Sequence, residues 1–180
     1  FTLKLDPDYI LYQWFINDME MQRDGSAFRT PRFPLPRQWH DTLMENSVIY
    51  FLLHELYREI RVATGSQVSY SQYMEEKLHD PDSRASVRAE GVLNKLITRV
   101  EGQGIPMGIV LFPGFTDLQD YALGFLHDRV LAVCRERDIR CLDLRPAYQP
   151  YNERIKDLWV NPFDAHPSKL AHRIAAEWIF

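Results

Sequence analysis

The sequence NPFDAHPSKLAH, residues 161–172, places a carboxylate, Asp164, two positions before an imidazole, His166. Pro167 suits the first turn of a helix, because its missing N–H would have no partner there. The polar Asp-x-His pair is therefore expected on a loop at the start of a helix. Loops held by a rigid element often carry catalytic side chains.

A C-terminal helix is expected behind this loop. Its apolar residues recur at helical spacing, so that one face can pack on a core. These residues are Leu170, Ala171, Ile174, Ala175 and Trp178. An interpretation without catalysis stays open at this point: His166 would cap the helix and Asp164 would form a turn, because Asp is common in turns.

Length and composition predict one ordinary domain that spans residues 1–180. The chain has 180 residues, 46% of them hydrophobic and 26% charged, and these fractions are close to those of globular domains. The net charge is −4 and no basic stripe stands out, so nucleic acid is not an expected partner. No apolar run approaches the roughly 18 to 20 residues of a membrane span, so no transmembrane segment is expected.

Cys134 and Cys141 are the two cysteines of the chain. One falls on an expected helix and the other at the start of an expected strand. Their spacing matches no metal-binding pattern, and it does not indicate a disulfide scaffold. We therefore expect both side chains to serve in ordinary packing.

Three apolar runs are expected to be strands, at residues 9–16, 107–112 and 140–144. The first run is mostly apolar on both faces, which is typical of a central strand covered on both sides. Amphipathic segments alternate with the runs and predict a three-layer α/β/α domain with a parallel sheet. Ligands of such folds bind at the carboxyl ends of the strands, and Asn17 and Asp18 follow the first strand at that edge.

A helix is expected after Ser47, whose side chain can cap it. Its apolar stripe consists of Ile49, Leu52, Leu53, Leu56 and Ile60, and its exposed face carries Glu55, Arg58 and Glu59. The residues before it, 19–46, are expected to form a long loop. Loops of this length are uncommon unless they have a function, such as covering a site.

Two further helices are expected between the strands, with a weaker helical signal around residues 73–78. The first begins at Asp82 or Ser83 and ends near Gly102. Its expected buried residues are Ala89, Val92, Leu93, Leu96, Ile97 and Val100. Thr116 and Gln119 have the spacing of a capping box and predict the start of the second.

Asn17-Asp18 after a buried strand, together with Asp164-Ala165-His166-Pro167 before the last helix, resembles the SGNH (GDSL-type) hydrolase family. The resemblance covers nearly all of the chain but corresponds to the later part of a family domain. It implies the flavodoxin-like SGNH fold, and a serine-type esterase or related O-acyltransferase without a cofactor. Its substrate would be a small acyl ester or an acylated carbohydrate.

The resemblance also implies a role for each site residue. Asn17 would donate its side-chain amide to an oxyanion, a type of contact worth about 3 to 4 kcal/mol in the transition state. His166 would be the general base that takes the serine proton. Asp164 would orient His166 and stabilise its imidazolium form.

Several positions depart from the family pattern. The commoner spacing, Asp-x-x-His, would place the carboxylate at Phe163, and Phe15 stands where the family usually has Gly. His172 matches a second histidine that is often found in the final helix, and we expect it to be structural. Family members begin with a strand ending in Gly-Asp-Ser, which carries the nucleophile; this chain starts after that point, and we expect that strand to be missing. Ser26, in Asp-Gly-Ser, has the wrong order and lies after Asn17.

Two other functions remain open from the sequence. A binding domain of the same fold would keep the architecture without the nucleophile. A metal-dependent hydrolase would use Asp164, His166 and His172 as ligands, although three groups without a fourth make a weak metal site.

Overall fold

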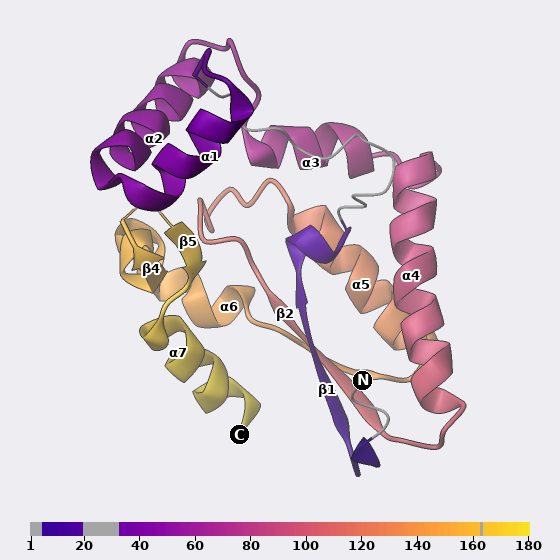
Figure 1. The fold of residues 1–180 in the computed structure, drawn as a ribbon. Coiled ribbons are helices and arrows are strands. Elements are labelled where there is room, and N and C mark those ends of the chain that lie inside the picture. The colour runs from indigo at the N-terminus through magenta and orange to yellow at the C-terminus, as the bar shows by residue number, and fades with distance from the viewer. Residues whose placement is uncertain (1–4, 20–32, 163) are drawn as a thin grey trace.

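The computed structural model describes residues 5–19, 33–162 and 164–180 and shows a mixed α/β protein with a parallel sheet (Figure 1). In chain order its elements are β1 (Ile10–Phe15), η2 (Ile16–Met19), α1 (Arg37–Asn46), α2 (Val48–Ala63), α3 (Tyr70–Leu78), α4 (Arg84–Glu101), β2 (Met107–Phe112), α5 (Gly124–Glu136), β3 (Arg140–Asp143), α6 (Arg145–Tyr148), η4 (Gln149–Leu158), β4 (Trp159–Asn161), β5 (Asp164–Pro167) and α7 (Lys169–Ile179). Among these described residues, none of the helices combines the length and apolar character needed to cross a bilayer.

The three strands β1, β2 and β3 lie in that order and run parallel. β1 pairs with β2 from Ile10 opposite Met107 to Phe15 opposite Phe112. All three predicted strands are therefore confirmed, but β1 is not central: within the described part of the chain it is an edge strand, and Leu11 on it is 48% exposed. β2 is the central strand and is buried along its whole length.

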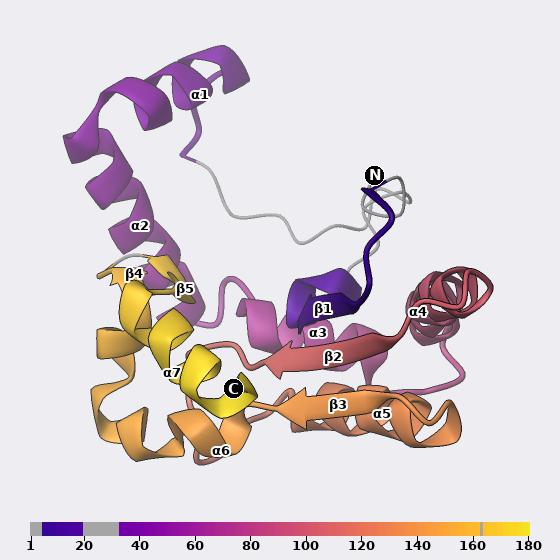
Figure 2. The same cartoon turned by 90° about the horizontal axis from the view of Figure 1, so that it is seen from below.

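The side chains of β2 point alternately to the two faces of the sheet. On each face they join an apolar core that includes helices. Ile109 and Leu111 belong to the core formed with α4 and α5. Val110 and Phe112 belong to the core formed with α6 and α7. The predicted parallel sheet between helical layers is therefore present around β2. Figure 2 shows β2 and β3 pointing toward the side of the molecule where β4, β5 and α6 lie.

Helix α4 follows the prediction closely. Ser83 caps it by accepting a hydrogen bond from the Ser86 N–H, and Gly102 is its C-cap. Four of the expected core residues are buried, namely Ala89, Leu93, Ile97 and Val100. Leu96 is partly buried, whereas Val92 is 47% exposed and was assigned wrongly.

Two helix starts differ from the prediction. Residues 37–46, expected within a loop, form α1, and residues 20–32 of that loop lie outside the described part of the chain. The helix expected from Thr116 begins only at Gly124. The carboxylate of Asp117 accepts hydrogen bonds from the backbone N–H groups of Gln119 and Asp120, and these bonds hold residues 117–120 in a turn instead.

Helix α2 starts after its predicted cap, Ser47, which accepts a hydrogen bond from the Tyr50 N–H. Its orientation differs from the prediction for the apolar stripe and for Glu55, whereas Glu59 is exposed as expected. The apolar stripe faces solvent, with Ile49 73% and Leu56 56% exposed, whereas Glu55 is buried. The other side of α2 is aromatic, and its Tyr57 ring stacks on Phe33 with the centroids 4.6 Å apart. His54 and Glu55 are the buried residues on this side of the helix.

The last helix, α7, begins two residues later than expected. Ser168 is the N-cap and accepts a hydrogen bond from the Ala171 N–H, so neither His166 nor Pro167 starts the helix. Ala171, Ile174 and Ala175 are buried as expected. Trp178 is 49% exposed, contrary to the expectation that it belongs to the buried face.

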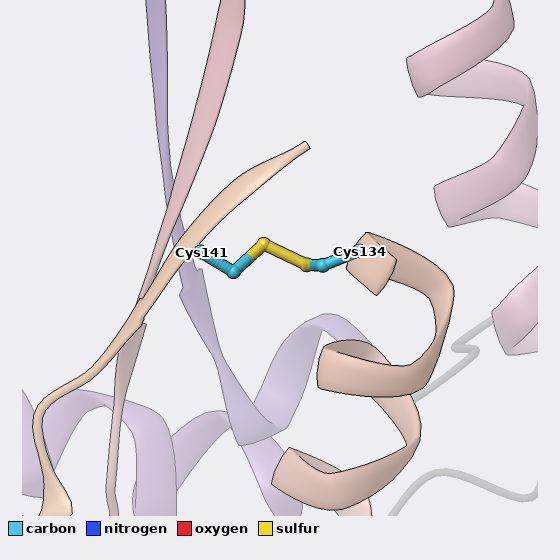
Figure 3. The surroundings of a disulfide bond; sticks show 2 residues. All are labelled: Cys134 and Cys141. Carbon is cyan, nitrogen blue, oxygen red and sulfur yellow. A yellow bond between two sulfur atoms is a disulfide. The ribbon is translucent and has the colours of Figure 1, made fainter. Parts of the chain in front are cut away.

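A disulfide joins Cys134 on α5 to Cys141 on β3, so the prediction of ordinary thiol packing is wrong (Figure 3). The two Cα atoms are 6.2 Å apart, within the usual range for a disulfide. The short α5–β3 connection reverses the chain through Asp138, whose φ is 52°. This turn brings together two cysteines that lie only seven positions apart.

We expect the double variant Cys134→Ala/Cys141→Ala to lose about 2 kcal/mol of unfolding free energy, because a short cross-link restricts the unfolded chain. Urea unfolding measures this loss. Reductant should lower the stability of the parent protein by a similar amount and leave the double variant unchanged. Equal stability of the parent protein with and without reductant would show that this disulfide does not stabilise the fold.

Candidate active site

Asp164 and His166 lie on β5, which pairs antiparallel with β4, and not on the open loop that was predicted. The hairpin is fixed at two points. The indole N–H of Trp159 donates to the Phe115 carbonyl oxygen at 2.7 Å, and the backbone N–H of Ser168 donates to the Leu158 carbonyl oxygen at 2.7 Å. Phe115 and Leu158 are fully buried, so the candidate site is tied to the core.

Asp164 holds His166 through a single carboxylate oxygen. Its Oδ1 accepts the backbone N–H of His166 at 3.0 Å and lies 2.5 Å from the imidazole Nδ1. These two hydrogen bonds, the backbone one first, lower the pKa of Asp164 below its ordinary value. A carboxylate at Nδ1 places the ring proton there and leaves Nε2 as the proton acceptor.

This pair is open to solvent. The side chain of His166 is 68% exposed and that of Asp164 is 42% exposed. An imidazole that is oriented on one side and accessible on the other can accept a proton from a reacting group. The contact is the arrangement that the resemblance implies for an orienting carboxylate, although the spacing is Asp-x-His. Phe163, where the commoner spacing would place the carboxylate, lies outside the described residues.

The end of β1 lies beside the His166 imidazole. The ring of Phe15, the last residue of β1, stacks on the His166 ring with the centroids 6.4 Å apart and the planes inclined by 29°. Phe15 therefore occupies one side of the imidazole, at the position where the family usually has Gly.

Asn17 lies in η2, which directly follows β1, and is exposed. The turn is fixed by the Phe15 backbone N–H, which donates to the Asp18 carboxylate at 2.9 Å. Phe15, which lies two positions before Asn17, is thus the residue of this segment that contacts the hairpin carrying His166.

A hollow of about 330 Å³ lies beyond the carboxyl ends of β2 and β3. Its lining consists of Leu118, Gln119, Tyr121, Arg145, Pro146 and Gln149. Neither Asn17 nor His166 lines it, so this hollow is not centred on the predicted site residues. The candidate site at β5 is instead an open surface around His166.

The structure contains a second histidine–aspartate pair that the sequence did not reveal. His127 on α5 contacts Asp143 at the end of β3, with Nδ1 3.1 Å from the carboxylate oxygen. The histidine is fully buried, and the rings of Trp14 and Tyr121 pack edge-on against it. Sixteen positions separate the two residues, so the pair exists only through the fold.

Burial makes this second pair structural. It lowers the pKa of His127, against the opposing effect of Asp143. Burial alone would raise the pKa of Asp143, but hydrogen bonds from His127 and Arg145 outweigh it and lower that pKa. Among the described residues no group bonds His127 Nε2, which is buried. A reacting group has no access to this imidazole, unlike that of His166.

The remaining candidate residues are not gathered around His166. His172 lies on α7, with its ring 5.9 Å from that of Phe112. Within the described ranges no three His, Cys, Asp or Glu side chains are placed to hold one metal ion. Several serine hydroxyls act as helix caps, at Ser47, Ser69, Ser83 and Ser168, while Ser26 lies outside the described residues.

Comparisons with models of known protein families, with curated proteins and with solved structures found no match.

The buried His127 predicts a stability that depends on pH. Its lowered pKa keeps it neutral in the folded protein, whereas in the unfolded chain it takes up a proton below about pH 6.5. Its contribution is therefore complete above that pH and is lost as the pH falls toward the pKa of the folded state.

We expect the free energy of unfolding in urea to fall between pH 7 and pH 5, and the fall to be smaller in His127→Phe. The quantity compared is the change in unfolding free energy from pH 7 to pH 5. A variant that is less stable at both pH values therefore does not affect the test. His172→Ala, a change at an exposed histidine, is the control and should keep the parent difference. If His127→Phe lost as much unfolding free energy between pH 7 and pH 5 as the parent protein, His127 would not be the source of the pH dependence.

Proposed function

We propose that this chain is part of a serine-type hydrolase of acyl esters, or of a related O-acyltransferase, with the flavodoxin-like SGNH fold. The observation that carries the proposal is the contact of Asp164 with His166 Nδ1 on an exposed hairpin beside the end of β1. In this proposal His166 is the general base and Asp164 its positioning residue.

Asn17 supplies the oxyanion contact in this proposal. Its amide N–H groups are donors, and it stands on the first turn after β1, whose last residue touches His166. A tetrahedral intermediate needs a donor and a base on the same side of the sheet. The meeting of β1 and β5 at one edge supports this arrangement.

The nucleophile in the proposal is a serine on a strand that is not part of these 180 residues. Within the described part of the chain, the edge of β1 away from β2 is unpaired, and this edge can accept another parallel strand. A serine at the carboxyl end of such a strand would arrive at the edge where Asn17 and His166 lie. The hydroxyl would give its proton to His166 Nε2 and attack the ester carbonyl.

The open site is compatible with the proposed substrate class. A small acyl ester or an acylated carbohydrate can approach an exposed imidazole from solvent, and the Phe15 ring offers an apolar surface beside it. The reaction needs no cofactor, because base, orienting carboxylate and oxyanion donor are all side chains.

The test compares the 180-residue chain with a natural chain that includes the proposed serine strand, using p-nitrophenyl acetate as the ester. We expect the longer chain to be active and the 180 residues to be nearly inactive, because a triad without its nucleophile keeps only residual catalysis. In the longer chain His166→Ala should lower kcat by about a thousandfold or more, and Asp164→Ala by less. His172→Ala is the matched control and should keep full activity.

A fluorophosphonate that labels reactive serines should modify the longer chain and leave the 180-residue chain unlabelled. Labelling of a serine within the 180 residues would show that the nucleophile is misplaced. Activity that survives His166→Ala and is abolished by a chelator would favour a metal-dependent hydrolase. A longer chain that binds an acylated carbohydrate without hydrolysing it would favour a binding domain.

A further inference from the structure

Helix α2 has its polar and apolar sides reversed relative to the rest of the protein. Six aliphatic side chains on its solvent face are between 38% and 75% exposed, namely Val48, Ile49, Leu52, Leu53, Leu56 and Ile60. The opposite side is buried although it carries His54 and Glu55, and Glu55 is paired with Arg58 at 2.7 Å. Contiguous exposed apolar faces of this kind mark sites of association.

The spacing within this face is that of a coiled-coil seam. Ile49, Leu53, Leu56 and Ile60 are separated by four, three and four positions, which is the alternation of a and d positions in a heptad. Val48 and Leu52 widen the exposed face on one side of this seam, and the seam positions are those through which two helices pack against each other.

The order of the seam residues indicates which helix this is. Ile, Leu, Leu, Ile reads the same in both directions. When two copies of α2 pair antiparallel about a two-fold axis, Ile49 lies opposite Ile60 and Leu53 opposite Leu56. Each layer then joins like residues, and the two copies present the same patch to each other, as in any isologous interface.

The charges beside the seam favour the same occupant. In this register Glu59 lies opposite Leu52 of the second copy, so the two Glu59 carboxylates do not face each other. Glu59 also has a cation in its own helix, with its carboxylate 3.3 Å from Arg58. The acidic Glu59 is exposed beside the seam, whereas helices that lie on anionic lipid present Lys and Arg there.

We propose that two copies of this chain associate through an antiparallel pairing of their α2 helices along Ile49, Leu53, Leu56 and Ile60. The proposal is independent of the catalytic one. The seam covers little more than three helical turns. On the neighbouring helix α1, Trp39 is a large aromatic side chain that is 59% exposed. The interface is therefore small, and we expect a dissociation constant in the micromolar range.

Sedimentation equilibrium on the whole chain, from a few to several hundred micromolar, tests the proposal. We expect a monomer–dimer equilibrium in the parent protein and a dissociation constant at least about tenfold higher in Leu53→Glu and in Leu56→Lys. Both side chains are already exposed, so the far-UV circular dichroism and Tm of the variants should match the parent. Val87→Glu, at a residue 58% exposed on α4, is the control and should dimerise normally.

Mixing the two variants tests the direction of pairing. In the antiparallel register Glu at 53 of one copy meets Lys at 56 of the other, so the mixture should recover dimers that neither variant forms alone. A parent protein that stays monomeric, a Leu53→Glu variant that dimerises normally, or a mixture that fails to recover would each overturn the proposal. Binding of the monomer to phosphatidylcholine–phosphatidylserine vesicles that is lost in Leu53→Glu would assign the face to lipid instead.

Discussion

The parallel pairing of β1 with β2 is the constraint on which the rest of the structure depends. Its register carries Phe15 to the level of Phe112, at the carboxyl edge of the sheet. From there the Phe15 ring reaches His166, 151 positions later in the chain. Without this register, the two motifs that resemble an esterase site would have no spatial relation.

The free energy that maintains this register comes from β2. All six of its residues are buried, and its five side chains other than Gly108 divide between two apolar cores. Full burial of each large aliphatic or aromatic side chain contributes about 1.5 to 3 kcal/mol before entropy is counted. The two histidine–aspartate pairs show the contrast between core and edge: His127 lies in the core and is kept neutral, whereas His166 lies at the edge and is open to solvent.

Local signals in the sequence were enough to predict β2, β3, α4 and most of the buried face of α7, because these elements follow from apolar periodicity and, for α4, from a capping serine. Apolar periodicity does not reveal which element packs against a given side of a helix. The stripe on α2 was recognised as apolar, but nothing in its spacing says that aromatic contacts would bury the opposite side. The disulfide was missed because the spacing of the two cysteines does not reveal the turn at Asp138 that brings them together. The contact of His127 with Asp143 was missed because only the fold brings these two residues together.

The candidate site depends on the contact between the end of β1 and the β5 hairpin at His166. The most direct measurement is a nuclear Overhauser effect between the ring protons of Phe15 and His166 in selectively labelled protein. Trp14 and His127, whose ring centroids are 5.2 Å apart, provide the internal positive control. We expect a cross-peak for both pairs. A Trp14–His127 cross-peak without one between Phe15 and His166 would contradict this expectation, because the candidate base would then lie away from the edge that carries Asn17.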